Sequence, residues 1–378
     1  MSAGGDAYRR FFGEQRDALV LGVLRLAISA LLFFNGLRLV LEFLHAGYFA
    51  DYFHMPLLPE TWLPSRTGYG LLLALQALAA LCAFVGIWPR EALLGASSLG
   101  LYFLLCDRLQ YHNNRYALLL LAFLLAFTPC DRSWLLVRGR KHTLPREQRI
   151  APTFARRLFQ IQVSLIYLGS TGGKLFDADW RSGQVLFMRY ARAAEQIASQ
   201  GHPLPAWVLV IFTSVWFASL AAKAAICSEL FIALGMWLPR VRRLALWLGV
   251  VFHISIELTA SVELFSWLML AAYFSFVIPE VRERRFEFMP GNTRAEWLAR
   301  FVQLFDWCAR FERSSLAPAG DREARSPAEG AAFYVTNREG RRASGALGLA
   351  QLAEAIPVLF PLWLPLALYA RLTTKRVA

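Results

Sequence analysis

The chain has 378 residues, of which 57% are hydrophobic and 18% are charged, and its mean hydropathy is +0.40. So many apolar side chains cannot be hidden in one soluble core, and the composition also excludes intrinsic disorder, a disulfide-stapled mini-domain and a fibre. The net charge of +13 would suggest nucleic-acid binding in a soluble protein, but in a membrane protein it is the expected excess of cytoplasmic basic residues, so no nucleic-acid partner is expected.

Apolar runs recur along the chain, and a hydrocarbon core of about 30 Å needs roughly 20 helical residues to cross it. The runs cover residues 18–44, 67–88, 92–106, 116–130, 158–176, 206–238, 244–260 and 262–279. They lack the strict alternation of a transmembrane barrel strand. The sequence therefore predicts an all-α polytopic membrane protein with about eight transmembrane helices over residues 18–279.

The basic residues predict how these spans are oriented. Residues 1–17 are polar and basic, and no cleavable signal peptide is evident, so the first span is expected to stay as an anchor. Further basic residues follow spans 2, 4, 6 and 8, where the positive-inside rule places cytoplasmic loops. We therefore expect a cell-membrane protein with both termini in the cytoplasm. This topology requires residues 206–238 to form one long span, with an interfacial start near 203–207, and not a hairpin.

The opposite, outer side is less basic and richer in Tyr and Trp, as expected at a membrane interface. Residues 184–199 have apolar residues at helical spacing and are predicted to form a helix that lies flat on the membrane. The five cysteines are scattered and include no CxxC motif. Neither structural disulfides nor dithiol chemistry is therefore expected.

Residues 280–378 are predicted to form a small cytoplasmic extension. Residues 294–313 resemble an amphipathic helix, 314–330 a linker, and 333–342 a hairpin with a glycine in its turn. Residues 349–371 are apolar but contain three prolines. A helical tail against the membrane is preferred to a ninth span, which would carry the last basic residues outward.

Ionisable side chains within predicted spans cost at least about 2.5–3.5 kcal/mol each, so each needs a reason. Arg38 and Glu42 are four residues apart and can pair on one helix face. His253 and Glu257 also share a face. A buried hydrogen-bonded pair is preferred there to a metal site, because no third ligand has a diagnostic spacing, and no metal is expected.

Lys174 stands at the end of the fifth run, in GSTGGKLFDADW (169–180), at the predicted outer surface. Contact with apolar helices favours a neutral amine, which can act as a base near neutral pH; contact with Asp177 or Asp179 would oppose this. The small residues before it would let other helices or a flat ligand approach the backbone. The alternative is a lysine that extends to the membrane interface.

A second polar cluster, YHNNRY (111–116), is predicted at a helix start on the same side. His112, Asn113, Asn114 and Arg115 provide hydrogen-bond donors and acceptors. The alternative is that an asparagine caps the helix. The topology places this cluster and Lys174 at helix ends on one face, which makes them candidates for a shared site.

These motifs resemble a known family. KLFDADW and YHNNRYALLLLAF are similar to elements of vitamin K-dependent gamma-carboxylase and its bacterial relatives, which share the horizontally transferred transmembrane (HTTM) domain. The start, VLRLAISALLFFNGLRL with Arg25, and the run FHISIEL with His253 are also similar. The resemblance covers residues 18–279.

The resemblance implies that Lys174 is the base that deprotonates reduced vitamin K or another quinol. In the family the resulting anion reacts with O2, and CO2 traps the carbanion formed at a glutamate. The implied catalytic residues are Lys174, Asn114 and His112. The implied substrate-binding residues are Asn113, Arg115, Tyr116, Asp177, Asp179, Trp180, His253, Glu257 and Arg25. The expected partners are the lipid bilayer, a lipophilic small molecule, and a peptide or protein substrate.

The chain departs from this pattern in three places. Phe176 is inserted after Lys-Leu, Gly173 replaces a second lysine of the eukaryotic enzyme, and Asn114 aligns with the family histidine, with His112 two residues earlier. An amide cannot exchange a proton as imidazole does. The tail resembles a DCC-family thiol-disulfide oxidoreductase domain without its cysteine pair, and is expected to be a degenerate docking remnant.

Two other classes of function stay open. One is a non-catalytic binding or assembly module, in which Lys174 points into lipid headgroups. The other is a transporter or redox-partner subunit, with a polar path lined by Lys223, Glu229 and Glu257.

Overall fold

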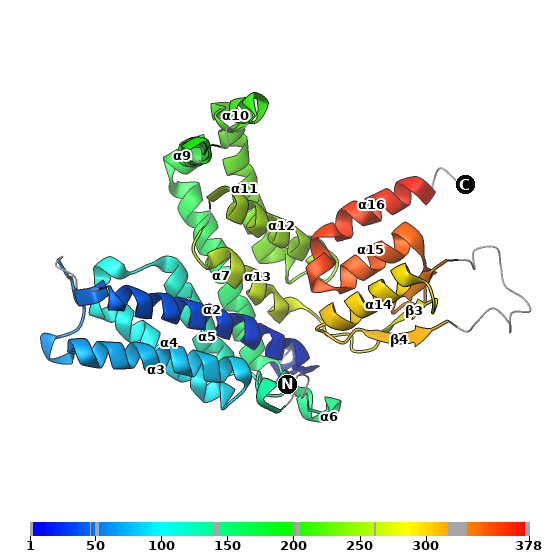
Figure 1. Ribbon diagram of the computed structural model, residues 1–378, viewed down its shortest axis with the longest axis horizontal. Helices are drawn as coiled ribbons and strands as arrows, with labels where there is room; N and C mark the ends of the chain where they lie inside the picture. Colours follow the sequence, from blue (N-terminus) through cyan, green and yellow to red (C-terminus); the bar gives the residue numbers. More distant parts are fainter. Residues whose placement is uncertain are drawn as a thin grey trace, which may run out of the picture. The chain divides into compact units, whose positions relative to one another are not determined.

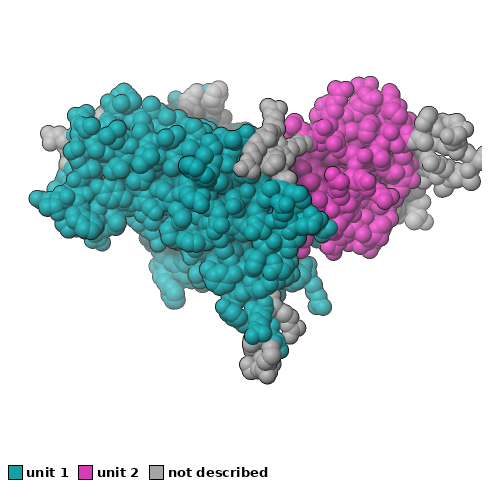
Figure 2. All heavy atoms as spheres, turned by 90° about the horizontal axis from the view of Figure 1, so that it is seen from below, with its two compact units in different colours: residues 1–277 teal, residues 278–378 magenta. Residues whose placement is uncertain are grey.

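The computed structural model describes residues 3–45, 47–49, 53–138, 144–199, 201, 205–260, 262–316 and 331–374. The chain forms two compact units, residues 1–277 and residues 278–378 (Figure 2). The division falls close to the boundary expected after residue 279. Each unit has its own elements and is described separately.

Unit 1 is helical apart from one short antiparallel pair of strands, β1 (Gln15–Asp17) and β2 (Ile150–Pro152). Its helices are α1 (Ala3–Gly13), α2 (Leu19–Leu44), α3 (Arg66–Val85), α4 (Pro89–Cys106), α5 (Asn113–Ala126), α6 (Arg146–Arg149), α7 (Phe154–Phe176), α8 (Ala178–Ser182), α9 (Gln184–Ser199), α10 (Ala206–Phe212), α11 (Val215–Gly235), α12 (Arg242–Ala260) and α13 (Phe265–Ala272). Short 3-10 turns lie at Gly47–Phe49, Glu60–Trp62, Arg108–Gln110, Leu136–Arg138 and Tyr273–Phe276.

The helices of unit 1 form two groups (Figure 1). Helices α2, α3, α4 and α5 pack against one another in chain order, and α7 packs on α5 and on α11. Helix α11 also contacts α8, α9 and α12. The core of the first group is aliphatic, and Leu24, Ile28 and Leu32 of α2 are fully buried.

Local sequence explains where the helices begin and end. The Ser65 hydroxyl accepts from the amide of Gly68 and caps α3. Gly86 then ends α3 in a left-handed conformation, with φ of 92°, which a residue without a Cβ adopts at little cost. Pro89 occupies the first turn of α4, where its missing N–H leaves no bond unmade.

Three helices of the described residues, α2, α3 and α11, are long and apolar enough to cross a membrane. The expected count of about eight spans is not supported. The 14 residues of α5 extend about 21 Å, which is less than a hydrocarbon core of about 30 Å, and α13 has only 8 residues. Helices α7 and α12 are longer but carry charged residues at both ends or within.

Residues 206–238 hold one helix of spanning length, as expected, but the segment is not one continuous helix. The chain forms the 7-residue α10, turns at Thr213–Ser214, and then forms α11 of 21 residues. The Ser214 hydroxyl accepts from the amide of Phe217 and starts α11. The segment therefore holds one helix of spanning length after a short helix, and residues 203 and 204 lie outside the described part.

Unit 2 corrects the all-α expectation, because it contains a four-stranded sheet in the order β4-β3-β5-β6. Strands β3 and β4 are parallel, and the other neighbours are antiparallel. The core joins Phe286, Val335, Val302, Leu352 and Ile356. The elements are β3 (Arg284–Phe288), α14 (Thr293–Phe305), β4 (Phe311–Ser315), β5 (Phe333–Thr336), β6 (Arg342–Ala343), α15 (Gly345–Ala355), a 3-10 turn (Pro357–Leu362) and α16 (Trp363–Thr374).

The helix predicted over 294–313 ends at Phe305, eight residues early. The Asp306 carboxylate accepts the amides of Arg310 and Phe311, so the chain leaves the helix and enters β4. Strand β4 was not predicted, because all its residues after Phe311 are exposed and its sequence therefore lacks an alternation of apolar and polar residues. The linker was predicted over residues 314–330. Residues 317–330 lie outside the described part, and residues 314–315 belong to β4.

The hairpin predicted over 333–342 is confirmed: β5 and β6 pair antiparallel, and Gly340 has φ of 78° in the turn. The apolar run 349–371 is broken into two helices, because α15 ends before Pro357 and a 3-10 turn follows. A proline inside a helix removes a hydrogen bond and clashes with the preceding turn.

Candidate functional site

Lys174 forms a buried ion pair with Glu229. Its Nζ contacts the Glu229 carboxylate, and the exposed side-chain fractions are 15% for Lys174 and 5% for Glu229. The Ser170 hydroxyl lies 3.0 Å from Lys174 Nζ and donates to Glu229 Oε1 at 3.2 Å. The three polar groups thus form a closed hydrogen-bonded cluster between α7 and α11.

The cluster follows from helix geometry. Ser170 and Lys174 are four residues apart and lie on one face of α7, the face that packs against α11. The Trp180 ring of α8 covers the lysine, with Nζ 4.8 Å from the ring centroid. The Asp177 carboxylate starts α8 by accepting the amides of Asp179 and Trp180.

Gly183 holds the turn after α8 against α11. It has φ of 89°, and a Cβ at this position would clash with the backbone of Ala218 and Ser219. Only glycine, which has no Cβ, can adopt this conformation so close to another stretch of backbone. The glycine therefore fixes the Trp180 ring over Lys174.

A second buried hydrogen-bonded group lies beside the ion pair. The Tyr167 hydroxyl lies 2.5 Å from His253 Nε2 and also bonds the Tyr273 hydroxyl. Gly249 makes the room, since a Cβ there would clash with the Tyr273 hydroxyl. His253 Nδ1 is buried without a hydrogen-bond partner in the described residues. Tyr167 is seven residues from Lys174 on the same face of α7, so the two groups lie about two helical turns apart.

The structure gives the 111–116 cluster other partners. His112 Nδ1 caps α5 by accepting the Asn114 amide, so the cap is the histidine and not an asparagine. The Asn114 side chain donates to the Glu263 carbonyl at 3.1 Å. In the described part of the chain, no hydrogen bond or ion pair joins Lys174 to His112 or Asn114.

The other members of that cluster lie near the surface. Asn113 and Tyr116 are exposed, and the rings of Tyr111 and Tyr116 lie 6.0 Å apart. Arg115 is half-buried. The Arg38 guanidinium contacts Glu42 at 3.5 Å, which confirms the predicted pair, and it also contacts Glu263 at 2.8 Å. Glu263 therefore ties α2 and the start of α5 to the start of α13.

Arg25 is completely buried, and its hydrogen bonds stabilise the helical bundle. Its five N–H groups donate to backbone carbonyl oxygens, which belong to Ala83, Phe84, Cys130, Ser133 and Trp134. These bonds join α2 to the end of α3 and to the segment after α5. The guanidinium has no donor left for a substrate.

Asp177, Asp179 and His253 are further predicted site residues. Asp177 and Asp179 are exposed, and the carboxylate that meets Lys174 is Glu229 instead. His253 bonds Tyr167, which differs from the expected pair with Glu257. No group of three His, Cys, Asp or Glu residues in the described ranges is arranged to hold a metal ion.

The glycines of 169–173 face open space. A Cβ on Gly169, Gly172 or Gly173 would meet nothing within 4 Å, so none of the described helices packs on them, and the approach of a flat ligand stays a prediction. Helical spacing places them away from Lys174, on the side of α7 that also carries the exposed Leu165 and Phe176. The lysine face of α7 is packed and the glycine face is open.

Sequence reasoning missed three residues of the site: Ser170, Tyr167 and Tyr273. Ser170 and Tyr167 could have been found by spacing, because each shares a helix face with Lys174. Tyr273 carries no such signal, because it is about 100 residues away in the chain. Glu229 was noted as a charge within a span, but its partner was not predicted.

Two residues of the polar path considered for a transporter, Lys223 and Glu229, do not meet among the described residues. Lys223 is exposed and donates to the Ser219 hydroxyl at 3.1 Å, whereas Glu229 pairs with Lys174. The two residues are six apart on α11 and therefore point to different sides of the helix.

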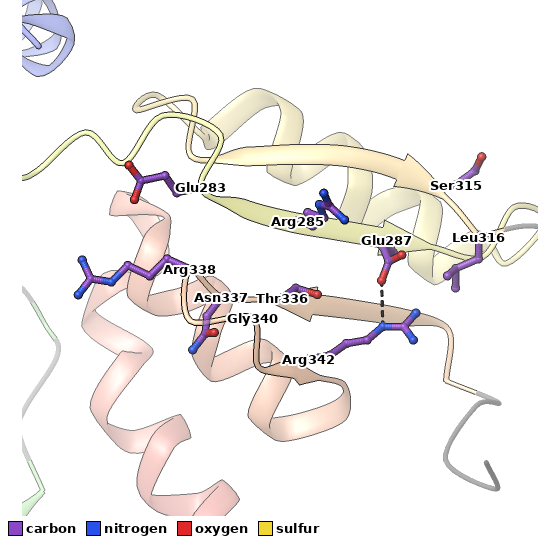
Figure 3. Close-up of a pocket in the computed structure, with 10 residues that line it drawn as sticks. All are labelled: Glu283, Arg285, Glu287, Ser315, Leu316, Thr336, Asn337, Arg338, Gly340 and Arg342. Atoms are coloured by element: carbon purple, nitrogen blue, oxygen red, sulfur yellow. Dashed lines mark hydrogen bonds and ion pairs between the residues drawn. The ribbon is translucent and has the colours of Figure 1, made fainter. Parts of the chain in front are cut away.

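A hollow of about 620 Å³ lies on the sheet of unit 2 (Figure 3). On β3, Phe286 enters the core while its neighbours Arg285 and Glu287 line the hollow, as strand alternation requires. Arg342 Nε donates to Glu287 Oε2 at 2.9 Å. Three arginines and two glutamates line the hollow, so opposite charges offset each other there.

The fold and the site define a helical membrane protein whose bundle buries a lysine–glutamate pair next to a tyrosine–histidine–tyrosine group. The model of the HTTM domain matches residues 14–280, which is more than half of the chain. The chain therefore belongs to the HTTM domain family, as the motifs predicted. No curated protein and no solved structure matches the chain. The gamma-carboxylase activity and the DCC-type tail stay predictions.

Proposed function

We propose that the protein is a membrane enzyme in which Lys174 removes a proton from a quinol or another lipophilic substrate. The observation that carries the proposal is the pairing of Lys174 with Glu229 inside the bundle. An ionisable pair this deeply buried is costly, and such pairs cluster at functional sites. A lysine that pointed into lipid headgroups, as a non-catalytic module would have it, would be more exposed than 15%.

Glu229 supplies what a lysine base needs. Lys174 can accept a proton only after it has lost its own, and the Glu229 carboxylate is in position to receive that proton directly. That transfer would leave a neutral amine next to a carboxylic acid. The amine then takes the hydroxyl proton of the quinol, which leaves a quinol anion and an ammonium group.

The surroundings of Lys174 suit an oily reactant. The indole of Trp180 lies over the amine, and Leu175 and Phe176 next to it are exposed, Phe176 by 88%. Exposed apolar side chains on a membrane-protein helix fit contact with lipid. A substrate dissolved in the bilayer would therefore approach α7 without crossing water.

Several finer features belong to this proposal. Reduced vitamin K or another quinol would be the substrate and O2 the co-substrate, with CO2 used if a peptide glutamate is the acceptor. The site would face the outer side of the cell membrane, with both termini in the cytoplasm. His253, Asn114 and His112 would assist through their hydrogen bonds, and the DCC-like tail would dock a partner.

The test is quinol-dependent oxygen uptake by the full-length protein in nanodiscs, with reduced vitamin K and ubiquinol as probes. Lys174→Ala should lower the uptake at least about 100-fold, because a positioned base contributes about 10²–10⁴-fold. Lys174→Arg should be equally inactive although it keeps the charge next to Glu229, because guanidinium does not release its proton.

Lys223→Ala is the matched control. Lys223 also donates to a serine four residues earlier, but it is exposed, so its loss should leave uptake unchanged. Thermal unfolding in detergent checks that each variant is folded. Unchanged uptake in Lys174→Ala, or no uptake by the wild type with either quinol, would contradict the proposal.

A further inference from the structure

Four arginines converge at the end of α7 that lies opposite Lys174. Arg156 and Arg157 are in the first turn of α7, Arg242 begins α12, and Arg16 belongs to β1. Two of them, Arg16 and Arg157, share the carboxylate of Glu14, which contacts Arg16 at 2.7 Å and Arg157 at 3.3 Å. Arg242 Nε donates to the Met236 carbonyl at 2.8 Å, next to the Trp237 ring that Arg157 contacts at 5.8 Å.

This arrangement is electrostatically unfavourable as it stands. Helix N-termini carry a partial positive charge, so cations in the first turn are disfavoured, and neither α7 nor α12 has an acidic residue there. The next carboxylate along the chain does not help, because Asp17 is bound by Arg149 through two bonds of 2.7 and 2.8 Å. The cluster therefore has more positive charge than its described neighbours neutralise.

Arg156 is the most constrained member. Arg156 is only 4% exposed. Its Nε donates to the Ser275 carbonyl at 2.7 Å, and its Nη2 donates to the Val277 carbonyl at 2.8 Å. Its Nη1 is buried and has no partner among the described residues. Buried donors are almost always satisfied, and an orphaned one on a charged group is costly.

Aromatic rings hold the cluster in shape. The Arg157 guanidinium lies 4.6 Å from the ring centroid of Phe11 and 5.8 Å from that of Trp237. Arg157 also donates to the Phe11 carbonyl and to Gln160. A guanidinium stacked in this way is preorganised, so little entropy is lost when it binds an anion.

We propose that this cluster, Arg16, Arg156, Arg157 and Arg242, binds a phosphate-bearing anion. Guanidinium groups bind phosphate through paired hydrogen bonds, and the two helix N-termini add donors and positive potential. Lipid headgroups and free phosphate share this chemistry. The anion would supply the negative charge that Glu14 provides only in part.

The experiment measures ligand-induced thermal stabilisation of the full-length protein in detergent. One arm titrates inorganic phosphate against sodium chloride of equal ionic strength, and the other titrates a short-chain phosphatidic acid against a phosphatidylcholine of the same chain length. Wild-type protein should show saturable stabilisation in at least one arm. Stabilisation by the lipid alone assigns the site to a headgroup, and stabilisation in both arms assigns it to phosphate in general.

Arg16→Gln and Arg242→Gln should each weaken the apparent Kd at least about tenfold, because each removes a charged hydrogen-bond donor to the anion. Glu14→Gln should tighten it, because it removes the competing carboxylate. A purely structural cluster would lose stability in this last variant without gaining affinity.

Arg90→Gln is the matched control, since Arg90 is exposed and donates to the Ala126 carbonyl, away from the cluster. It removes the same charge and should leave the Kd unchanged. No saturable stabilisation of the wild type in either arm would overturn the proposal. So would an equal loss of affinity in Arg90→Gln, which would indicate general attraction to a basic protein.

Discussion

Two ion pairs, each between a basic side chain and a glutamate, lie in different environments in the two units. In unit 1, Lys174 and Glu229 have exposed side-chain fractions of 15% and 5%. In unit 2, Arg342 and Glu287 are 2.9 Å apart, and their fractions are 40% and 27%. Both pairs join residues that are far apart in the chain.

The comparison shows that burial, and not the pairing itself, sets the energetic consequences. At the surface, water solvates each partner almost as well as the other partner does, so the pair contributes about 0–1 kcal/mol. Inside the bundle each charge has lost its water, so either partner alone is strongly destabilising. A buried pair can therefore be kept for chemistry, whereas a surface pair can be exchanged at little cost.

The largest effect is expected for Glu229→Gln. It leaves the Lys174 ammonium buried without a carboxylate, which costs about 3–5 kcal/mol. The double variant Lys174→Met/Glu229→Leu should regain most of this stability, since it removes both charges and keeps the volume. Thermal unfolding in detergent measures both. A single variant as stable as the wild type would show that the amine is solvated, and would remove the basis for its role as a base.

A smaller effect is expected for Gly249→Ala. The new methyl group would clash with the Tyr273 hydroxyl, and overpacking of this kind costs about 1–3 kcal/mol. Gly172→Ala is the matched control, because a Cβ there meets nothing within 4 Å, and alanine favours a helix by up to about 1 kcal/mol. The lower Tm should therefore belong to Gly249→Ala. The reverse order would mean that Tyr273 does not pack against α12 as described.

The pair between His54 and Asp107 is an intermediate case, since Asp107 is buried and His54 is 24% exposed. Burial raises the pKa of Asp107, but bonds from His54 and from the amides of Met55 and Leu109 outweigh it, so the pKa is lowered. The stabilisation is therefore present above the ordinary aspartate pKa of about 3.9, and is lost as the pH falls through the lower folded value.

Thermal unfolding between pH 6 and pH 3 tests this linkage. Asp107→Asn should unfold at lower temperature than the wild type at pH 6, and the difference should shrink toward pH 3. Asp179→Asn, at an exposed position, should follow the wild type throughout. A difference that stays constant with pH would show that the carboxylate charge does not contribute.

The smallest effect is expected for Glu287→Gln in unit 2. The loss should be about 0–1 kcal/mol, and adding salt should reduce it further, because exposed pairs are screened. Unfolding of the variant and the wild type at low and high salt measures the difference. A loss as large as that of Glu229→Gln would mean that exposure does not separate the two pairs.

The membrane character, most helices and the position of Lys174 at a helix end could be predicted, because they depend on local patterns. The apolar runs predicted helices at all eight places, and the KLFDADW motif placed Lys174 at a helix end, where the structure has it. The resemblance implied that Arg25 binds a substrate, but all its donors bind backbone carbonyl oxygens. What it contacts could not be predicted, since its five carbonyl partners come from two distant segments.

The sheet of unit 2 and the break at Thr213–Ser214 were missed for a different reason. Strand β4 is an edge strand with one buried residue, so its sequence lacks a clear alternation. Residues 206–238 are apolar throughout, and composition alone does not show where such a run turns. The eight-span count failed in the same way, because hydropathy does not give the length of each helix.

By itself, the sequence determined the protein's family, its membrane class and the residue types available for chemistry, because these follow from composition and from short motifs. The tertiary structure decided which of them meet: Glu229 with Lys174, Tyr167 with His253 and Tyr273, and Arg16 and Arg157 with Glu14. The physical reason is that a pKa, an ion pair or an anion site depends on distance and burial in space, and residues on different helices carry no record of either in their own sequence.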